Sequence, residues 1–271
     1  MQVGIFDGGR LGVREPRGVR DVTDWAFAHA RIRTHDPMLA MIDALKSADA
    51  PQGTVLERDE VRWRAPILAP SKIVAAAANY EKHTQEMNPG VAAPGGVREK
   101  GFFLKAPSSI IGPGDSIRLP FPDRRTDYEA ELAVVIGRRA KNIAPDEVLD
   151  HVFGYTCLLD ITVRGKEDRG LRKSFDTFTP IGPYITLREE VPDPNRLAIS
   201  CRINDEVRQD DTTASMTMPV RELIAWMSSV MTLLPGDVIA TGTPAGVGPL
   251  ASGDRVVASI ERLGSLAVTV A

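Results

Sequence analysis

The chain has 271 residues, of which 43% are hydrophobic and 25% charged, and its formal net charge is -3. This composition is typical of a globular protein with a substantial core, and the charge gives no electrostatic reason for nucleic-acid binding. Cys157 and Cys201 lack disulfide-framework or metal-ligand spacing, and no apolar stretch resembles a signal peptide or a membrane span. We therefore expect a cytoplasmic protein without nucleic-acid or membrane partners.

Residues 1–70 are predicted to form a small N-terminal α/β domain, separate from residues 71–271. The first domain opens with a strand-like run, Val3–Phe6. Asp36-Pro37 begins a predicted helix, because Asp is a good N-cap and Pro suits the first helical position. Strand-like residues return from Val55 to Leu68.

The remainder of the chain is predicted to be rich in strands. Turns with Gly and Asp, whose backbone preferences favour tight reversals, precede several strand-like runs. Asn88–Gly101 is predicted to be a mobile loop. Two hairpins and two helices are predicted at these positions: Leu197–Val207, Arg255–Val270, Pro145–His151 and Pro219–Leu233.

Glu129 and Glu131 are the most informative acidic pair. The stretch from Tyr128 to Ile136 is typical of a strand, so both glutamates share one face, about 7 Å apart. Like charges on an otherwise apolar face repel each other, and a divalent cation between them would remove that conflict. The alternative is a solvated face with each glutamate paired to Arg124 or Arg125, and the spacing alone favours it.

Asp160 makes a metal site a stronger hypothesis. It ends the apolar run Tyr155–Leu159, and an Asp among such residues is rarely buried without a partner. A turn or an ion pair with Arg164 would satisfy it without a metal. A third carboxylate would complete an oxygen-rich site of the kind that Mg²⁺ prefers.

Several other groups could carry chemistry. His83 and Glu86 are three residues apart, so on a helical turn Glu86 could orient the imidazole to activate a water, although spacing alone favours a surface ion pair. Arg164 and Lys173 flank a polar loop and would suit a substrate carboxylate or a developing enolate, or they are ordinary solvated charges. The glycine-rich loop Thr241–Gly248 lacks the lysine of a phosphate-binding loop, but could offer amides and hydroxyls to an anion.

Six segments together resemble the fumarylacetoacetate hydrolase family, and most closely its short, FAHD-like acylpyruvase and oxaloacetate decarboxylase branch. Residues 1–70 match only loosely. The segments occur in the family's order and cover nearly everything from residue 72 onward: KIVAAAANYEKHTQEM, FFLKAPSSIIGPGD, DYEAELAVVIGRRAKNI, GYTCLLDITVR, KSFDTFTPIGP and MTLLPGDVIATGTPAGVGPL.

The resemblance implies an α+β, strand-rich fold, with a β-roll or sandwich catalytic core over residues 71–271, few helices and a small N-terminal domain, usually as a homodimer. It implies Mg²⁺, or Mn²⁺ or Ca²⁺ in its place, held by Glu129, Glu131 and Asp160. The remaining roles that it implies are a catalytic dyad on a lid, His83 and Glu86; an enolate-stabilising cation, Lys173; and substrate-binding groups, Arg164, Lys105, Thr243 and Glu167.

Two departures bear on the substrate. The family commonly has Arg-Asp-x-Gln after the metal-binding Asp, whereas here Glu167 stands at the place of that Gln. An extra negative charge there would disfavour a dianionic substrate, or it would neutralise Arg164 or Lys166. The segment Val91–Gly96 is inserted in the lid.

The leading hypothesis is therefore a divalent-metal-dependent hydrolase that cleaves a C–C bond in a small 2,4-dioxo acid of the acylpyruvate or fumarylpyruvate type. His83 and Glu86 favour it, because decarboxylation needs mainly a metal as electron sink. The alternatives are decarboxylation of an oxaloacetate-like 2-oxo acid and hydration or isomerisation of an unsaturated one in aromatic catabolism. A third class is a metal-binding family member without turnover.

Overall fold

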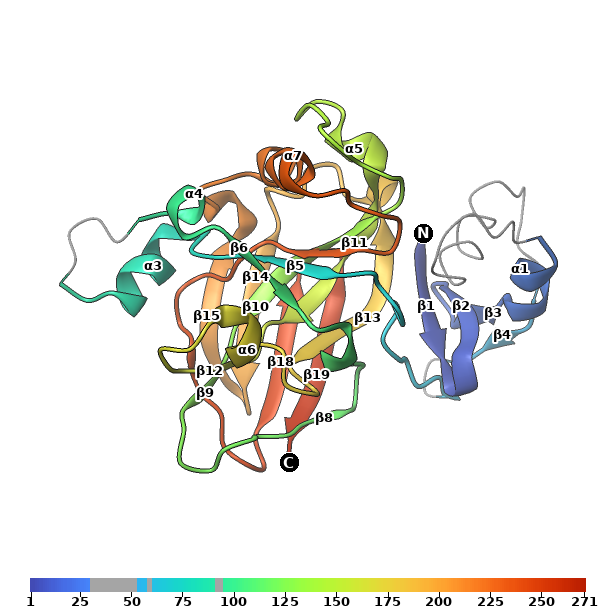
Figure 1. The fold of residues 1–271 in the computed structure, drawn as a ribbon. Helices are drawn as coiled ribbons and strands as arrows, with labels where there is room; N and C mark the ends of the chain where they lie inside the picture. Colours follow the sequence, from blue (N-terminus) through green and yellow to red (C-terminus); the bar gives the residue numbers. More distant parts are fainter. Residues whose placement is uncertain (30–52, 58–59, 91–94) are drawn as a thin grey trace.

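The computed structural model describes residues 1–29, 53–57, 60–90 and 95–271, which form three β-sheets with short helices around them (Figure 1). The largest sheet has eleven strands in the order β4-β3-β2-β1-β13-β11-β10-β16-β5-β6, with β7 also paired to β13. Its strands are β1 Gln2–Phe6, β2 Arg10–Arg14, β3 Val19–Asp21, β4 Val55–Leu56, β5 Ile73–Ala76, β6 Phe102–Lys105, β7 Ile110–Ile111, β10 Ala130–Ile136, β11 Val152–Leu159, β13 Thr179–Leu187 and β16 Val238–Ala240.

Two smaller sheets complete the strand framework. One has the order β15-β14-β18-β19-β8, and the other the order β12-β9-β17. Their strands are β8 Ser116–Ile117, β14 Ala198–Ile203, β15 Glu206–Thr212, β18 Arg255–Ile260 and β19 Gly264–Val270, then β9 Thr126–Tyr128, β12 Thr162–Val163 and β17 Gly248–Pro249.

The helices among the described residues are short, and none is long and apolar enough to cross a membrane. The α-helices are α1 Thr23–His29, α3 Glu81–Met87, α4 Val97–Lys100, α5 Val148–His151, α6 Arg169–Arg172 and α7 Val220–Val230. The 3-10 helices are η1 Asp7–Gly9, η3 Pro107–Ser109, η4 Arg188–Glu190 and η5 Thr213–Ser215. Strands thus dominate, and the predicted α+β, strand-rich class is confirmed.

Strand β10 lies between two hydrophobic cores, because alternate side chains of a strand point to opposite faces. Leu132, Val134 and Ile136 pack into the larger core, together with residues of β14, β18, β19 and α7. Ala133 and Val135 pack on the opposite face with residues of β1, β5 and β16. The predicted alternation is confirmed, but both faces are buried, so the solvated face considered for Glu129 and Glu131 is absent.

The predicted hairpins are β14–β15 and β18–β19, whose strands pair antiparallel. The helix predicted at Pro219–Leu233 is α7, and the one at Pro145–His151 is reduced to the single turn α5. Within the loop predicted at Asn88–Gly101, the segment Val97–Lys100 forms α4, and residues 91–94 lie outside the described residues. So does the helix predicted from Asp36.

The N-terminal strands join the main sheet at its edge. Gln2 and Val3 of β1 pair with Thr186 and Ile185 of β13, and β2, β3 and β4 follow outward (Figure 1). In Figure 1 this unit stands to one side of the strand-rich body. The division into domains at residues 70 and 71 stays a prediction.

Candidate metal centre and active site

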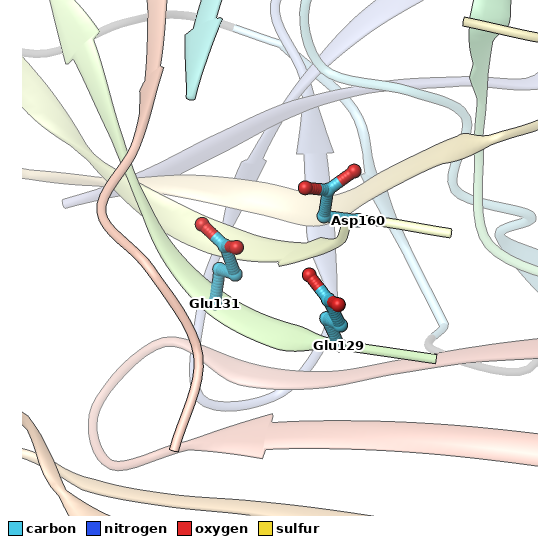
Figure 2. A group of neighbouring side chains, drawn as sticks. All are labelled: Glu129, Glu131 and Asp160. Atoms are coloured by element: carbon cyan, nitrogen blue, oxygen red, sulfur yellow. The ribbon is translucent and has the colours of Figure 1, made fainter. Parts of the chain in front are cut away.

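The pairing register of two central strands brings three acidic residues together. Ala130 and Glu131 of β10 lie opposite Leu159 and Leu158 of β11, so Asp160, one residue beyond β11, comes beside Glu129. The Asp160 N–H donates to the Glu129 carbonyl at 2.8 Å. Carboxylate oxygens of Glu129, Glu131 and Asp160 lie within 4.8 Å of one another, and all three residues are buried (Figure 2).

The segment after β16 holds Glu131 from the other side. Thr241 and Thr243 donate to the carbonyls of Leu132 and Ala130, at 3.1 Å from the Thr241 N–H and 2.8 Å from the Thr243 hydroxyl. The Gly242 N–H between them donates to Glu131 Oε2 at 2.7 Å. Gly242 has φ of +101°, and a Cβ there would lie 2.8 Å from Asn79 Cβ. A glycine is therefore needed for this contact.

Three cations contact two of the three carboxylates, and two of these cations, Lys105 and Lys173, are buried. Lys173 Nζ donates to Glu129 Oε2 at 2.7 Å and to Asp160 Oδ2 at 2.5 Å. Arg164 Nη2 lies 2.8 Å from Glu129 Oε1. Lys105 Nζ bonds to Asp160 Oδ1 and, at 2.9 Å, to the Phe178 carbonyl. Burial raises the pKa of Glu129, but the charges of Lys173 and Arg164 outweigh it and hold that pKa below its ordinary value.

Glu131 is the carboxylate without a cationic partner among the described residues. Burial and the charge of Asp160 raise its pKa well above the ordinary value. Such a group is stabilised as an anion by an added cation, and hard divalent ions take several carboxylate oxygens at once. The donor set therefore fits an ion such as Mg²⁺ or Mn²⁺.

A cavity of about 530 Å³ opens over this cluster. Its floor includes Glu129 and Glu131, and its wall includes His83 of α3. This volume is in the range of small-molecule sites. The lining residues are Ala76, Ala77, Ala78, His83, Thr84, Met87, Asn88, Lys100, Phe103, Arg125, Glu129, Glu131, Arg164, Gly165, Arg169, Arg172, Lys173, Gly242 and Thr243.

His83 and Glu86 form a pair on α3, as their spacing allows. His83 Nδ1 lies 3.3 Å from Glu86 Oε2, and the Gly246 N–H donates to Glu86 Oε1 at 3.1 Å. Burial raises the pKa of Glu86, but these two hydrogen bonds outweigh it and lower that pKa. An ionised Glu86 accepts the Nδ1–H of His83, which leaves Nε2 unprotonated as a base. The start of α3 is anchored by Asn79, which donates to the carbonyls of Met218 and Thr241 at 3.0 and 2.8 Å.

Most of the predicted site residues lie at this cavity. Six line it: His83, Glu129, Glu131, Arg164, Lys173 and Thr243. Asp160 contacts Lys173 and Glu86 contacts His83, which are both lining residues, and Lys105 contacts Asp160. Glu167 does not line the cavity, and its carboxylate pairs with Arg124, with Nη1 to Oε1 at 3.0 Å.

Sequence reasoning missed several residues that shape the site. Asp127 is fully buried and accepts from Arg125 and Arg164, each at 2.7 Å. Its position two residues before Glu129 on a strand was the available signal. Gly242 and Asn79 act through backbone placement and gave no signal of their own. The basic residues Arg169 and Arg172 were seen only as part of a polar loop.

The fold and the acidic cluster are those of an enzyme that acts on small molecules. A family model, fumarylacetoacetate (FAA) hydrolase C-terminal, matches residues 72–271. The chain belongs to the fumarylacetoacetate hydrolase family. It is 40% identical to maleylpyruvate hydrolase of Aquipseudomonas alcaligenes, over 100% of this chain and 99% of that protein. It is 42% identical to the mitochondrial oxaloacetate tautomerase FAHD2A of Bos taurus, over 83% of this chain and 74% of that one.

Solved structures agree with this placement. A crystal structure of maleylpyruvate hydrolase from Sphingobium sp. SYK-6, in complex with manganese(II) and pyruvate, matches with a TM-score of 0.85 and 38% identity. The match covers 100% of this chain and 98% of that chain. An isomerase structure from Mycobacterium smegmatis, 5-carboxymethyl-2-hydroxymuconate delta-isomerase, matches over 100% and 98% with a TM-score of 0.78 and 32% identity.

Proposed function

We propose that this chain is a divalent-metal-dependent hydrolase that cleaves a C–C bond in a small 2,4-dioxo acid of the acylpyruvate type. The observation that carries the proposal is the cavity that is lined by His83, which pairs with Glu86, and by Glu129 and Glu131 of the acidic cluster. Full-length similarity to a protein named maleylpyruvate hydrolase supports the same reaction class.

Glu129, Glu131 and Asp160 are the proposed metal ligands. The convergence of their carboxylates and the unpaired charge of Glu131 support this assignment. Mg²⁺ is our first candidate, with Mn²⁺ next because a related structure contains manganese(II), and Ca²⁺ third. A divalent ion bound there supplies a Lewis acid that chelates a 2-oxo acid and withdraws electrons from its ketone.

The reaction is R–CO–CH₂–CO–COO⁻ + H₂O → R–COO⁻ + CH₃–CO–COO⁻ + H⁺. His83 Nε2 takes a proton from the water, whose oxygen bonds to the carbonyl carbon 4 of the substrate. The bond between carbons 3 and 4 then breaks, and its electron pair stays on carbon 3, conjugated with the 2-oxo group. Carbon 3 is finally protonated, which yields pyruvate and the second acid. Glu86 stabilises the imidazolium that exists between these proton transfers.

The remaining predicted residues take supporting roles in this proposal. Lys173 has its ammonium beside Glu129 and Asp160, where it would bind substrate oxygens and stabilise the developing enolate. Arg164 and Thr243 line the same floor and would contact the substrate carboxylate. Lys105 holds Asp160 in place. Glu167 pairs with Arg124, so its effect on the substrate would be indirect, through that arginine.

Turnover assays with Mg²⁺ or Mn²⁺ test the proposal. Wild-type protein is expected to release pyruvate from acylpyruvates, and His83→Ala to lower kcat about 100-fold or more, as for loss of a general base. Lys82→Ala, an exposed neighbour on α3, serves as the control. The proposal is overturned if acetylpyruvate, maleylpyruvate and fumarylpyruvate all fail to yield pyruvate in the presence of metal.

Oxaloacetate separates the main proposal from its nearest alternative. Decarboxylation requires no attacking water, so His83→Ala should affect it less than hydrolysis. Equal losses on both substrates would remove the argument for a water-activating dyad. We further propose that the enzyme is a cytoplasmic homodimer. Sedimentation equilibrium of the purified protein tests its oligomeric state.

A further inference from the structure

Three cations at the outer part of the cavity have no acidic partner. Lys100, Arg169 and Arg172 all line the cavity. Among the residues that the structure describes, no carboxylate lies within 4.0 Å of their charged nitrogens. Unpaired cations gathered around a concave site attract anions, since the surrounding protein focuses their field.

The inner part of the cavity differs, because its charges are already balanced. Asp127 and the acidic cluster supply four carboxylates, and three of these, all but Glu131, are contacted by four cations: Arg125, Arg164, Lys105 and Lys173. A divalent ion and the 2-oxo carboxylate that chelates it would leave this inner balance close to neutral. The excess positive charge of the outer group is then available to another part of the substrate.

The outer arginines are fixed in place by the backbone. Arg172 Nε donates to the Glu167 carbonyl at 2.8 Å, and its Nη1 donates to the Val163 carbonyl at 3.1 Å. Burial lowers the pKa of Arg172, and repulsion from Arg164 and Arg169 lowers it further. These like charges are thus held together with no carboxylate of the described residues in contact with them, an arrangement that a bound anion relieves.

Glu167 does not supply that counterion. Its carboxylate pairs with both terminal nitrogens of Arg124, which lies outside the cavity lining. The negative charge of Glu167, which the family resemblance places among the substrate-binding residues, is therefore neutralised by Arg124. This removes the reason to expect a dianionic substrate to be disfavoured.

We propose that Arg172 and Arg169, with Lys100 beside them, bind a second carboxylate at the end of the substrate distant from the 2-oxo acid. The guanidinium group is suited to this because it can donate two parallel hydrogen bonds to a carboxylate. The enzyme then selects dicarboxylic 2,4-dioxo acids over acylpyruvates that end in an alkyl group. This inference rests on the proposed function, and it makes Arg172 and Arg169 specificity-determining residues.

The test compares two unreactive ligands that differ at one end. 2-Oxoadipate ends in a carboxylate and 2-oxohexanoate in a methyl group, and the binding of each to Mn²⁺-loaded protein is measured by calorimetry. Wild type should bind the diacid about 10- to 100-fold more tightly, the range for hydrogen bonds to a charged group. Arg172→Ala and, separately, Arg169→Ala should reduce this ratio while leaving 2-oxohexanoate binding unchanged.

Arg139→Ala is the matched control, because it removes an exposed arginine that does not line the cavity. It should keep the wild-type ratio. Arg169→Ala is a second test in case the Arg172 variant misfolds, since the Arg169 side chain makes a long, 3.4 Å bond to the Lys100 carbonyl whereas Arg172 makes two shorter bonds to the backbone. Equal binding of both ligands by wild type, or a ratio that survives in both arginine variants, would overturn the inference.

Turnover assays test the inference independently of the binding measurements. If the diacid is bound preferentially and the arginine variants lose that preference, but no acylpyruvate is hydrolysed, then the proposed function fails and the carboxylate subsite stands. If both maleylpyruvate and acetylpyruvate are hydrolysed with equal kcat/KM and Arg172→Ala lowers both equally, the subsite fails and the hydrolase stands.

Discussion

The inner and outer parts of the cavity differ in how their charges are balanced. Inside, buried carboxylates and buried cations contact each other directly, as with Lys173 between Glu129 and Asp160. Outside, Arg169 and Arg172 are kept together without an acidic partner among the described residues. A balanced interior can hold a metal and its chelated ligand in a fixed geometry, whereas an unbalanced mouth selects a ligand by its charge. Chemistry and specificity are thus assigned to different residues.

The largest expected effect comes from Glu131, the member of the acidic cluster without a cation. Glu131→Gln should lower metal-dependent activity by at least about 100-fold, because a metal ligand is lost. The apo-protein should be no less stable than wild type, since the variant removes a buried charge that burial disfavours. Thermal unfolding with EDTA and with Mn²⁺ measures both effects.

Glu222→Gln, at an exposed position of α7, controls for the change of acid to amide. A Glu131→Gln protein that keeps its Mn²⁺-dependent rise in Tm would show that Glu131 is not a ligand. In that case the charge balance in the inner part of the cavity would need another explanation.

The next prediction tests whether Lys105 balances the buried carboxylates of the inner part of the cavity or binds the substrate. Lys105→Met should lower the free energy of unfolding by about 3 kcal/mol, because a fully buried ion pair with Asp160 loses one partner. Chemical denaturation measures this change, and Lys82→Met, at an exposed position, is the control. A variant of wild-type stability whose KM alone rises would assign Lys105 to the substrate instead.

A smaller effect separates the two parts of the cavity by salt. Raising KCl from about 0.01 M to about 0.15 M shortens the screening length from roughly 30 Å to roughly 8 Å. Lys100 is exposed and Arg169 and Arg172 are half-buried, whereas Lys105 and Lys173 are buried, so binding of 2-oxoadipate should weaken several-fold while that of 2-oxohexanoate changes less. Equal weakening would place the salt-sensitive charges in the inner part.

The smallest effect concerns the contact between α3 and the glycine-rich loop. The pKa of Glu86 is lowered in the folded state, so its contribution to stability is present above its ordinary pKa and is lost as pH falls through the lowered value. Below about pH 4.5 the hydrogen bond from Gly246 should therefore weaken, and hydrogen exchange of residues 81–87 should speed up. Glu86→Gln, which does not titrate, should show a flatter pH dependence; an identical one would exclude this contact as the cause.

The sequence by itself determined the local features of this protein. Alternation from Tyr128 to Ile136 predicted the faces of β10, three-residue spacing placed His83 and Glu86 on one helical turn, and Gly and Asp marked the hairpins. These features depend on near neighbours, whose geometry the backbone period fixes. The six ordered segments added the family, which the match over residues 72–271 confirms.

Tertiary structure alone decided what surrounds each charge. The register between β10 and β11 puts Asp160 beside Glu129, and Arg124, more than forty positions before Glu167 in the chain, draws that carboxylate away from the cavity. Sequence spacing cannot predict such partners, because electrostatic interactions depend on distance in space and on burial. For the same reason, the place of Arg172 in the polar loop before Lys173 does not indicate that it lines the cavity.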